Sequence, residues 1–106
     1  MRGEAVNFTG SGILWNSEGS LVGFLIGMDN ATDPQITFYD GLSSAGRQIT
    51  PTTDLDATAM GFNGAMPGIM HIPFRTGLYV LVEDYDGTAW SGTLEGIAYI
   101  ASGQKS

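Results

Sequence analysis

Acidic residues gather in the segment EDYDGTAW, residues 83–90, where carboxylates alternate ahead of a glycine. Calcium loops of the EF-hand type use such alternation, because oxygen ligands come from set positions of a 12-residue loop. Counted from the first aspartate, the first, third, fifth and twelfth positions are filled by Asp84, Asp86, Thr88 and Glu95. The sixth position, which requires glycine, holds Ala89, and no amphipathic helix flanks the segment. The pattern therefore argues against an EF-hand.

A looser cation site would use Asp84 and Asp86, helped by Glu83. The alternative is a loop between two strands, in which aspartate side chains bond to the local backbone. Trp90 ends the same loop and allows two interpretations. It either stacks on a sugar or a base, or anchors a partner, or it folds over the end of the core. Trp15, beside another predicted turn, allows the same interpretations.

The residues that could support catalysis are isolated in the sequence. His71 is the only histidine and lies within a predicted strand. A general base needs a nucleophile or a substrate proton within hydrogen-bond reach. Ser11, within the GSG segment of residues 10–12, and the Ser43–Ser44 pair lack the strand–turn–helix setting of a nucleophile elbow. No phosphate-binding loop or dinucleotide fingerprint occurs. We therefore expect no enzymatic activity and no cofactor.

Composition narrows the class of partner. The chain has 106 residues, a formal net charge of −7 and only 4 basic residues. Without a basic cluster, nucleic acid and anionic membranes are unfavourable partners. The absence of cysteine excludes disulfides and thiolate metal sites. The longest apolar run, residues 21–28, is too short to span a bilayer, and the first ten residues lack the apolar core of a signal peptide.

Periodicity close to two, interrupted by Gly, Asn, Asp and Pro, predicts an all-β fold without substantial helix. We expect one domain over residues 1–106, a compact antiparallel β-sandwich or barrel of about 7–8 strands, in which residues 1–10 could form an N-terminal arm. The predicted strands are Ala5–Thr9, Ile13–Asn16, Leu21–Met28, Gln35–Asp40, Arg47–Thr50, Ile69–Phe74, Leu78–Tyr85 and Thr93–Ala101.

Two connections and one strand pattern add detail. The turn NSEG, residues 16–19, predicts a hairpin between Ile13–Asn16 and Leu21–Met28, and residues 84–92 predict another between the last two strands. Within residues 21–28, alternation groups Val22, Phe24, Ile26 and Met28 on one face and Leu21, Gly23, Leu25 and Gly27 on the other. Both faces are apolar, so the strand is either covered on two sides or part of a subunit interface.

The loop MGFNGAMPGIM, residues 60–70, is rich in glycine and methionine and carries no charge. Methionine adapts to irregular contact surfaces, so the loop is either tucked under the end of the sandwich or docked on a neighbour. An N-terminal arm could also add a strand to a neighbour's sheet. The predicted interface residues are Val6, Phe8, Met60, Phe62, Met66 and Trp90.

Three segments carry a resemblance to a known class: ITFYDGLSSAGRQI (36–49), DATAMGFNG (56–64) and IPFRTGLYVLVED (72–84). Together they resemble small β-sandwich structural proteins of tailed bacteriophages, of the capsid decoration (cement) or head-associated type, over about residues 21–100. The resemblance implies a symmetric oligomer on the virion and no catalytic residues.

The resulting expectation is a capsid decoration protein that oligomerises, as a homotrimer, and stabilises the head by bridging subunits of the major capsid protein. Its location would be the capsid surface, after synthesis in the bacterial cytoplasm. A neck or tail component of the same virion would share the fold. The alternative from another class is a carbohydrate-binding or adhesion module that uses Trp90, Trp15 and the Asp84/Asp86 loop.

Overall fold

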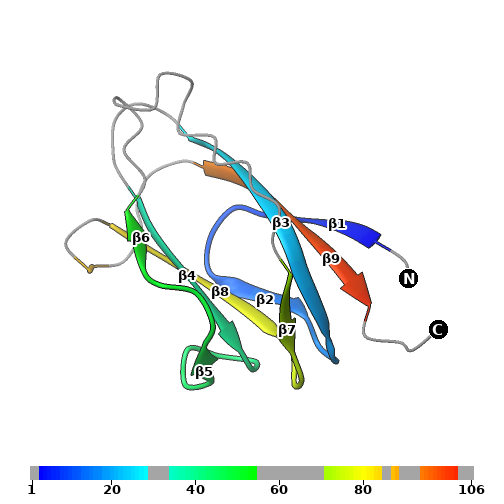
Figure 1. Ribbon diagram of the computed structural model, residues 1–106. Helices are drawn as coiled ribbons and strands as arrows, with labels where there is room; N and C mark the ends of the chain where they lie inside the picture. The colour runs from blue at the N-terminus through cyan, green and yellow to red at the C-terminus, as the bar shows by residue number, and fades with distance from the viewer. Residues whose placement is uncertain (1–2, 29–33, 55–70, 85–86, 89–93, 103–106) are drawn as a thin grey trace.

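Two antiparallel β-sheets stack face to face in the computed structural model, which describes residues 3–28, 34–54, 71–84, 87–88 and 94–102 (Figure 1). These residues form strands and no helix, which confirms the prediction of an all-β antiparallel sandwich. The strands are β1 (Gly3–Phe8), β2 (Gly12–Trp15), β3 (Gly19–Met28), β4 (Pro34–Asp40), β5 (Arg47–Gln48), β6 (Thr53–Asp54), β7 (Ile72–Phe74), β8 (Leu78–Asp84) and β9 (Leu94–Ser102). No helix in the described ranges is long and apolar enough to cross a membrane.

The strand order is that of a jelly roll. One sheet, here called sheet A, has the order β1-β9-β3-β7, and the other, sheet B, has the order β2-β8-β4-β5, with β6 also paired to β4. If β5 and β6 are taken as one interrupted edge strand, eight strands result, and neighbours in each sheet alternate between the first four and the last four in chain order. This is the double Greek-key arrangement of jelly rolls.

Both predicted hairpins are wrong, because their strands lie in different sheets. β2 pairs with β8 in sheet B, whereas β3 pairs with β9 and β7 in sheet A. β8 likewise belongs to sheet B and β9 to sheet A. Short turns between adjacent strands favour hairpins, but here the chain crosses from one sheet to the other at each of these turns. The crossing lets both strands of each pair contribute a face to the same core.

A β-bulge corrects the predicted faces of β3. The register between β3 and β9 shifts between Leu21 and Gly23. One extra residue at that point reverses the alternation. Leu21 therefore points into the core with Phe24 and Ile26 and is fully buried, whereas Leu25 stays on the outer face. The alternation of the sequence alone predicts Leu21 on the face of Leu25, which is wrong because of the bulge.

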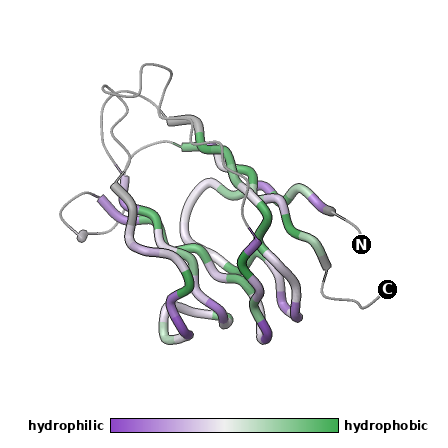
Figure 2. Tube along the Cα trace, in the orientation of Figure 1, coloured by the Kyte–Doolittle hydropathy of each residue, from purple (hydrophilic) through white to green (hydrophobic). Residues whose placement is uncertain are grey.

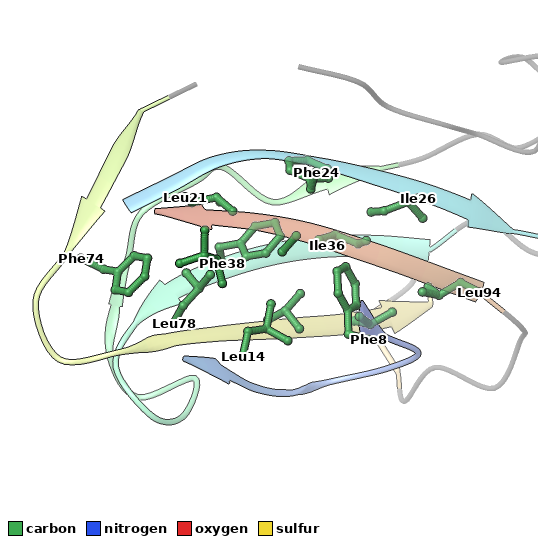
Figure 3. Close-up of a cluster of buried hydrophobic side chains, with 14 residues drawn as sticks. Phe8, Leu14, Leu21, Phe24, Ile26, Ile36, Phe38, Phe74, Leu78 and Leu94 are labelled. Atoms are coloured by element: carbon green, nitrogen blue, oxygen red, sulfur yellow. The ribbon is translucent and has the colours of Figure 1, made fainter. Parts of the chain in front are cut away.

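The core fills the space between the two sheets (Figure 3). Phe38 of β4 lies at its centre, where its ring centroid is 5.2 Å from that of Phe24 and 6.5 Å from that of Phe8. Leu78, Val80 and Val82 on one face of β8 are buried, as the alternation predicts. Figure 2 shows the hydrophobic residues concentrated in the strands and the hydrophilic ones at the turns of one end of the sandwich.

The first and last strands are locked together by an aromatic ring over a glycine. Phe8 and Gly96 are directly opposite each other in the β1–β9 ladder. A Cβ at position 96 would overlap the ring of Phe8. The ring thus occupies the space that a side chain would need, a known way to compensate for glycine in a sheet. Gly96 is required here by close packing.

Candidate functional site

The residues considered for catalysis are dispersed. His71 is exposed and directly precedes β7. Ser43 lies in the exposed loop after β4, where its Oγ accepts a hydrogen bond from the backbone N–H of Ala45 at 3.1 Å. Among the described residues, no three His, Cys, Asp or Glu side chains come close enough to hold a metal ion.

The acidic segment after β8 begins with a tight turn. The backbone N–H of Gly87 donates to the carbonyl of Asp84 at 2.8 Å, and the N–H of Asp84 donates to the carbonyl of Thr88 at 2.9 Å. Gly87 has a φ of 86°, which glycine adopts without strain. This pattern matches a turn that closes with a glycine bulge. Asp84 shapes that turn, while Asp86 lies outside the described residues.

The carboxylate of Asp84 is only partly satisfied. Its Oδ2 is 3.5 Å from the Oγ1 of Thr88, which can donate to it, and its Oδ1 is buried without a hydrogen-bond partner. A cation would need further oxygen ligands. Among the described residues, no group of three His, Cys, Asp or Glu side chains that could hold a metal ion includes it. Asp86, the other predicted ligand, lies outside the described residues, so the cation site remains a prediction.

A second carboxylate, Asp40, ties the end of β4 to the loop between β7 and β8. The backbone N–H groups of Arg75 and Thr76 donate to its two oxygens at 3.0 and 2.9 Å. Next to it, the N–H of Gly41 donates to the carbonyl of Gly77 at 3.0 Å. The YDG and RTG signatures of the sequence thus meet in space. They form a structural junction between the end of β4 and the loop that joins β7 to β8.

Burial and hydrogen bonding have opposite effects on the pKa of the Asp40 carboxyl group. Burial alone would raise the pKa of its carboxyl group, but the hydrogen bonds from the N–H groups of Thr76, Arg75 and Gly77 and from the Arg47 side chain stabilise the ionised form. The net result is a pKa below the ordinary 3.8. The ion pair to Arg47 is 3.5 Å long, with the arginine side chain 70% exposed and that of Asp40 only 7% exposed. The backbone bonds therefore matter more than the exposed ion pair.

The outer face of sheet A carries an apolar patch at its centre. Leu25 of β3 lies directly opposite Ile97 of β9, and the next outward position of β9 is Tyr99, opposite Gly23. Leu25 is 39% exposed and Tyr99 is 37% exposed, while Ile97 is half-buried. We call Ala5, Leu25, Ile97 and Tyr99 the sheet A patch, since Ala5 of β1 pairs with Tyr99. It is an uncharged surface across three neighbouring strands.

The outer face of sheet B carries an aromatic row. The registers place Ile13 of β2 opposite Tyr79 of β8, Tyr79 opposite Tyr39 of β4, and Tyr39 opposite Gln48 of β5. The row therefore crosses sheet B from one edge to the other. The tyrosine rings are 6.5 Å apart between centroids and inclined at 57°. Ile13 is 54% exposed, and Gln48 is exposed at the other end. We call these four residues the sheet B row.

The predicted interface residues fall differently. The prediction that Phe8 is an interface residue is wrong, because its side chain is buried in the core and forms no surface contact in this fold. Val6 is partly buried and packs against the same core. Met60, Phe62, Met66 and Trp90 lie outside the described residues. Trp15, considered as a ligand platform, is half-buried against the core, and its Nε1 is buried without a hydrogen-bond partner.

The surfaces that the structure does present could have been found in part from the sequence. Tyr79 and Leu81 share the less buried face of β8, as alternation indicates. The alignment of Ile13, Tyr39 and Gln48 with Tyr79 depends on strand pairing over long sequence distances. No local pattern encodes that pairing. Compared with known proteins, the chain matches no family model, no curated protein and no solved structure.

Proposed function

We propose that this chain is a structural protein of a tailed-bacteriophage virion, a decoration protein that binds the capsid through the sheet A patch. The exposed, uncharged patch around Leu25 and Tyr99 is the observation that carries the proposal. Large apolar side chains on a flat outer face are typical of contact surfaces. The major capsid protein is the partner that the resemblance of residues 36–49, 56–64 and 72–84 implies.

Two further features support an assembly role. Jelly rolls are frequent in viral capsid and lectin domains, although a fold alone does not establish function. The junction at Asp40 gives the two signature segments, YDG and RTG, a purely structural purpose. Stabilisation would be mechanical: an area buried across two capsid subunits must be exposed again before they separate. A stable contact of this kind buries roughly 800 Å² on each partner, so the patch would be its centre.

Replacing Leu25 with lysine tests the docking face. The charge would be placed at the centre of the contact without disturbing the core, because this side chain already points outward. We expect Leu25→Lys to weaken binding to capsids stripped of this protein by about 10-fold to 30-fold, as for loss of a central contact residue. Co-sedimentation with such capsids measures the effect.

Leu42→Lys is the matched control, because Leu42 is 46% exposed in the loop after β4, away from the outer face of sheet A. It should leave capsid binding within about 2-fold of wild type. Equal losses in the two variants would remove the sheet A patch from the proposal. Failure of the wild-type chain to bind stripped capsids would remove the decoration role itself.

A second candidate function, carbohydrate binding, is favoured by the sheet B row. Neighbouring exposed aromatic rings stack on the apolar faces of sugars, and an amide such as Gln48 can bond to hydroxyl groups. In this candidate, the Tyr39–Tyr79 pair, whose ring centroids are 6.5 Å apart, would be the stacking surface. These residues differ from the tryptophans and aspartates that the sequence indicated. Asp84 is engaged in a turn instead.

Tyr79→Ala tests this candidate on a glycan array. If sugars bind the row, the substitution should reduce binding to any retained glycan by about 10-fold or more, on the scale of the about 1–3 kcal/mol that a nucleic-acid base loses when its stacking ring is removed. Tyr99→Ala, on the opposite sheet, is the matched control and should leave the signal unchanged. Absence of glycan binding by the wild-type chain would reject the candidate.

A further inference from the structure

The four edges of the two sheets differ in how well they resist pairing with another chain. Edge strands expose unpaired N–H and C=O groups, and proteins blunt them with short length, proline, bulges or charge. β7 has 3 residues and contains Pro73. β2 has 4 residues and a register shift between Ile13 and Trp15. β5 and β6 have 2 residues each. Three of the four edges are therefore blunted.

The remaining edge, β1, is open. It has 6 residues, GEAVNF, and pairs with β9 in continuous register from Gly3 to Phe8 without a bulge. It contains no proline and no basic residue, and Glu4 is its only charge. Among the described strands, β9 is its only ladder partner, and Figure 1 shows β1 at the outer margin of its sheet. Ala5 and Asn7 are exposed along it.

We propose that β1 pairs with β1 of a second copy, antiparallel about a two-fold axis, and joins the two A sheets into one continuous sheet. The four sheet edges indicate which strand can pair with β1. A partner strand must offer an equally long and regular edge, and β1 is the only such edge in the described part of the chain. Pairing of identical edges closes as a dimer.

The expected homotrimer is less compatible with these edges. A ring of three requires β1 to pair with a different edge on the next copy. The described alternatives are interrupted by Pro73, by the bulge in β2 or by their short length. The dimer does not depend on capsid binding. It would, however, join two sheet A patches on the same outer surface, because the two-fold axis runs perpendicular to the joined sheet.

The register of the new ladder is limited to two solutions. Side chains opposite each other must point to the same face of the joined sheet, and only a ladder centred on Ala5 or on Val6 pairs all but one of the 6 residues of each strand. Either Ala5 or Val6 therefore lies on the axis and faces its own copy. In the first case Glu4 lies opposite the partner's Val6, and in the second opposite the partner's Phe8. Neither register brings the two Glu4 carboxylates opposite each other, so the only charge of β1 does not oppose the pairing.

Analytical ultracentrifugation of the full chain tests the dimer. The wild type should sediment with twice the 11.2 kDa chain mass at high concentration and dissociate on dilution. The double variant Ala5→Lys/Asn7→Lys places cationic side chains on the outward positions of β1 in both registers. It should raise the dimer dissociation constant by at least about 10-fold. The charge-matched Ser44→Lys/Gln48→Lys, at exposed positions of sheet B and its loop, should dimerise like wild type.

Single-cysteine cross-linking gives an independent readout, because the chain has no natural cysteine. Under mild oxidation, Ala5→Cys or Val6→Cys, whichever lies on the axis, should form a disulfide-linked dimer, while Gln48→Cys should form no covalent dimer. A monomer at all concentrations, a trimer, or a dimer that the β1 lysines do not weaken would overturn the proposal. So would absence of cross-linking at both positions. All of these measurements are made without capsids, so their outcome is separate from that of the docking test.

Discussion

Gly96→Ala is expected to destabilise the protein by about 2–3 kcal/mol, as overpacking of a filled core does. The new Cβ would overlap the Phe8 ring, which lies directly opposite in the β1–β9 ladder. The ring cannot move aside freely, because it is buried and packs edge-on against Phe38. Urea denaturation should show a lower midpoint with an unchanged slope.

Gly12→Ala is the control for this prediction, because nothing lies within 4 Å of a Cβ at position 12. Its effect should stay within about 0.5 kcal/mol. Phe8→Ala should cost about 3–5 kcal/mol alone. In that background Gly96→Ala should cost far less than in the wild type, since the overlapping ring is gone. Additive effects of the two substitutions would contradict the proposed contact.

Asp40→Ala is expected to cost about 2–3 kcal/mol, because charge-assisted bonds to the N–H groups of Arg75 and Thr76 would be lost together. The loss should be visible as a lower melting temperature. Arg47→Ala removes only the exposed ion pair and should cost about 0–1 kcal/mol. A larger effect of Arg47→Ala than of Asp40→Ala would show that the ion pair, rather than the backbone bonds, holds the junction.

The same carboxylate predicts a dependence of stability on pH. The folded pKa of Asp40 lies below the ordinary value of 3.8, so the unfolded chain binds this proton more readily. The stabilisation is therefore fully present above the unfolded pKa and is lost as pH falls through the folded pKa. The stability gap between wild type and Asp40→Asn should be constant from about pH 5 to 8 and should narrow below about pH 4. A gap that widens on acidification would contradict this assignment.

Local pattern was sufficient to predict strands but not their partners. Alternation in Leu78–Asp84 indicated its buried face correctly, because each side chain's direction depends only on its position in the strand. The pairing of β2 with β8 joins residues more than sixty positions apart. The turn at residues 16–19 favours a hairpin locally, and only burial of both strands against one core overrides it. The bulge at Val22 escaped prediction for the same reason, since it responds to the packing of Leu21.

For the candidate surfaces too, local sequence predicts individual residues, whereas their placement depends on tertiary packing. Phe8 was expected to contact a neighbour because it belongs to a terminal segment, yet Gly96 and Phe38 form a site for its ring. Its burial depends on two residues that are distant in the sequence. The sheet B row likewise arises from the registers of four strands. Alternation in a sequence can place a tyrosine on the outer face of a strand, but the alignment of such residues is a property of the assembled sheet.

The pairing of the first strand with the last has a consequence for folding. β1 finds its ladder partner only when β9 has been synthesised, about ninety residues later, which at ribosomal rates takes roughly 5–20 s. Contacts between such distant segments also make folding slow, because a long loop must close before they form. During this interval both margins of β1 are unpaired on a nascent chain. Neighbouring ribosomes on one messenger RNA would then hold identical unpaired β1 strands. Pairing of the β9-side margin with β9 completes the native sheet, whereas pairing of that margin with β1 of a neighbouring chain would give a misassembled product.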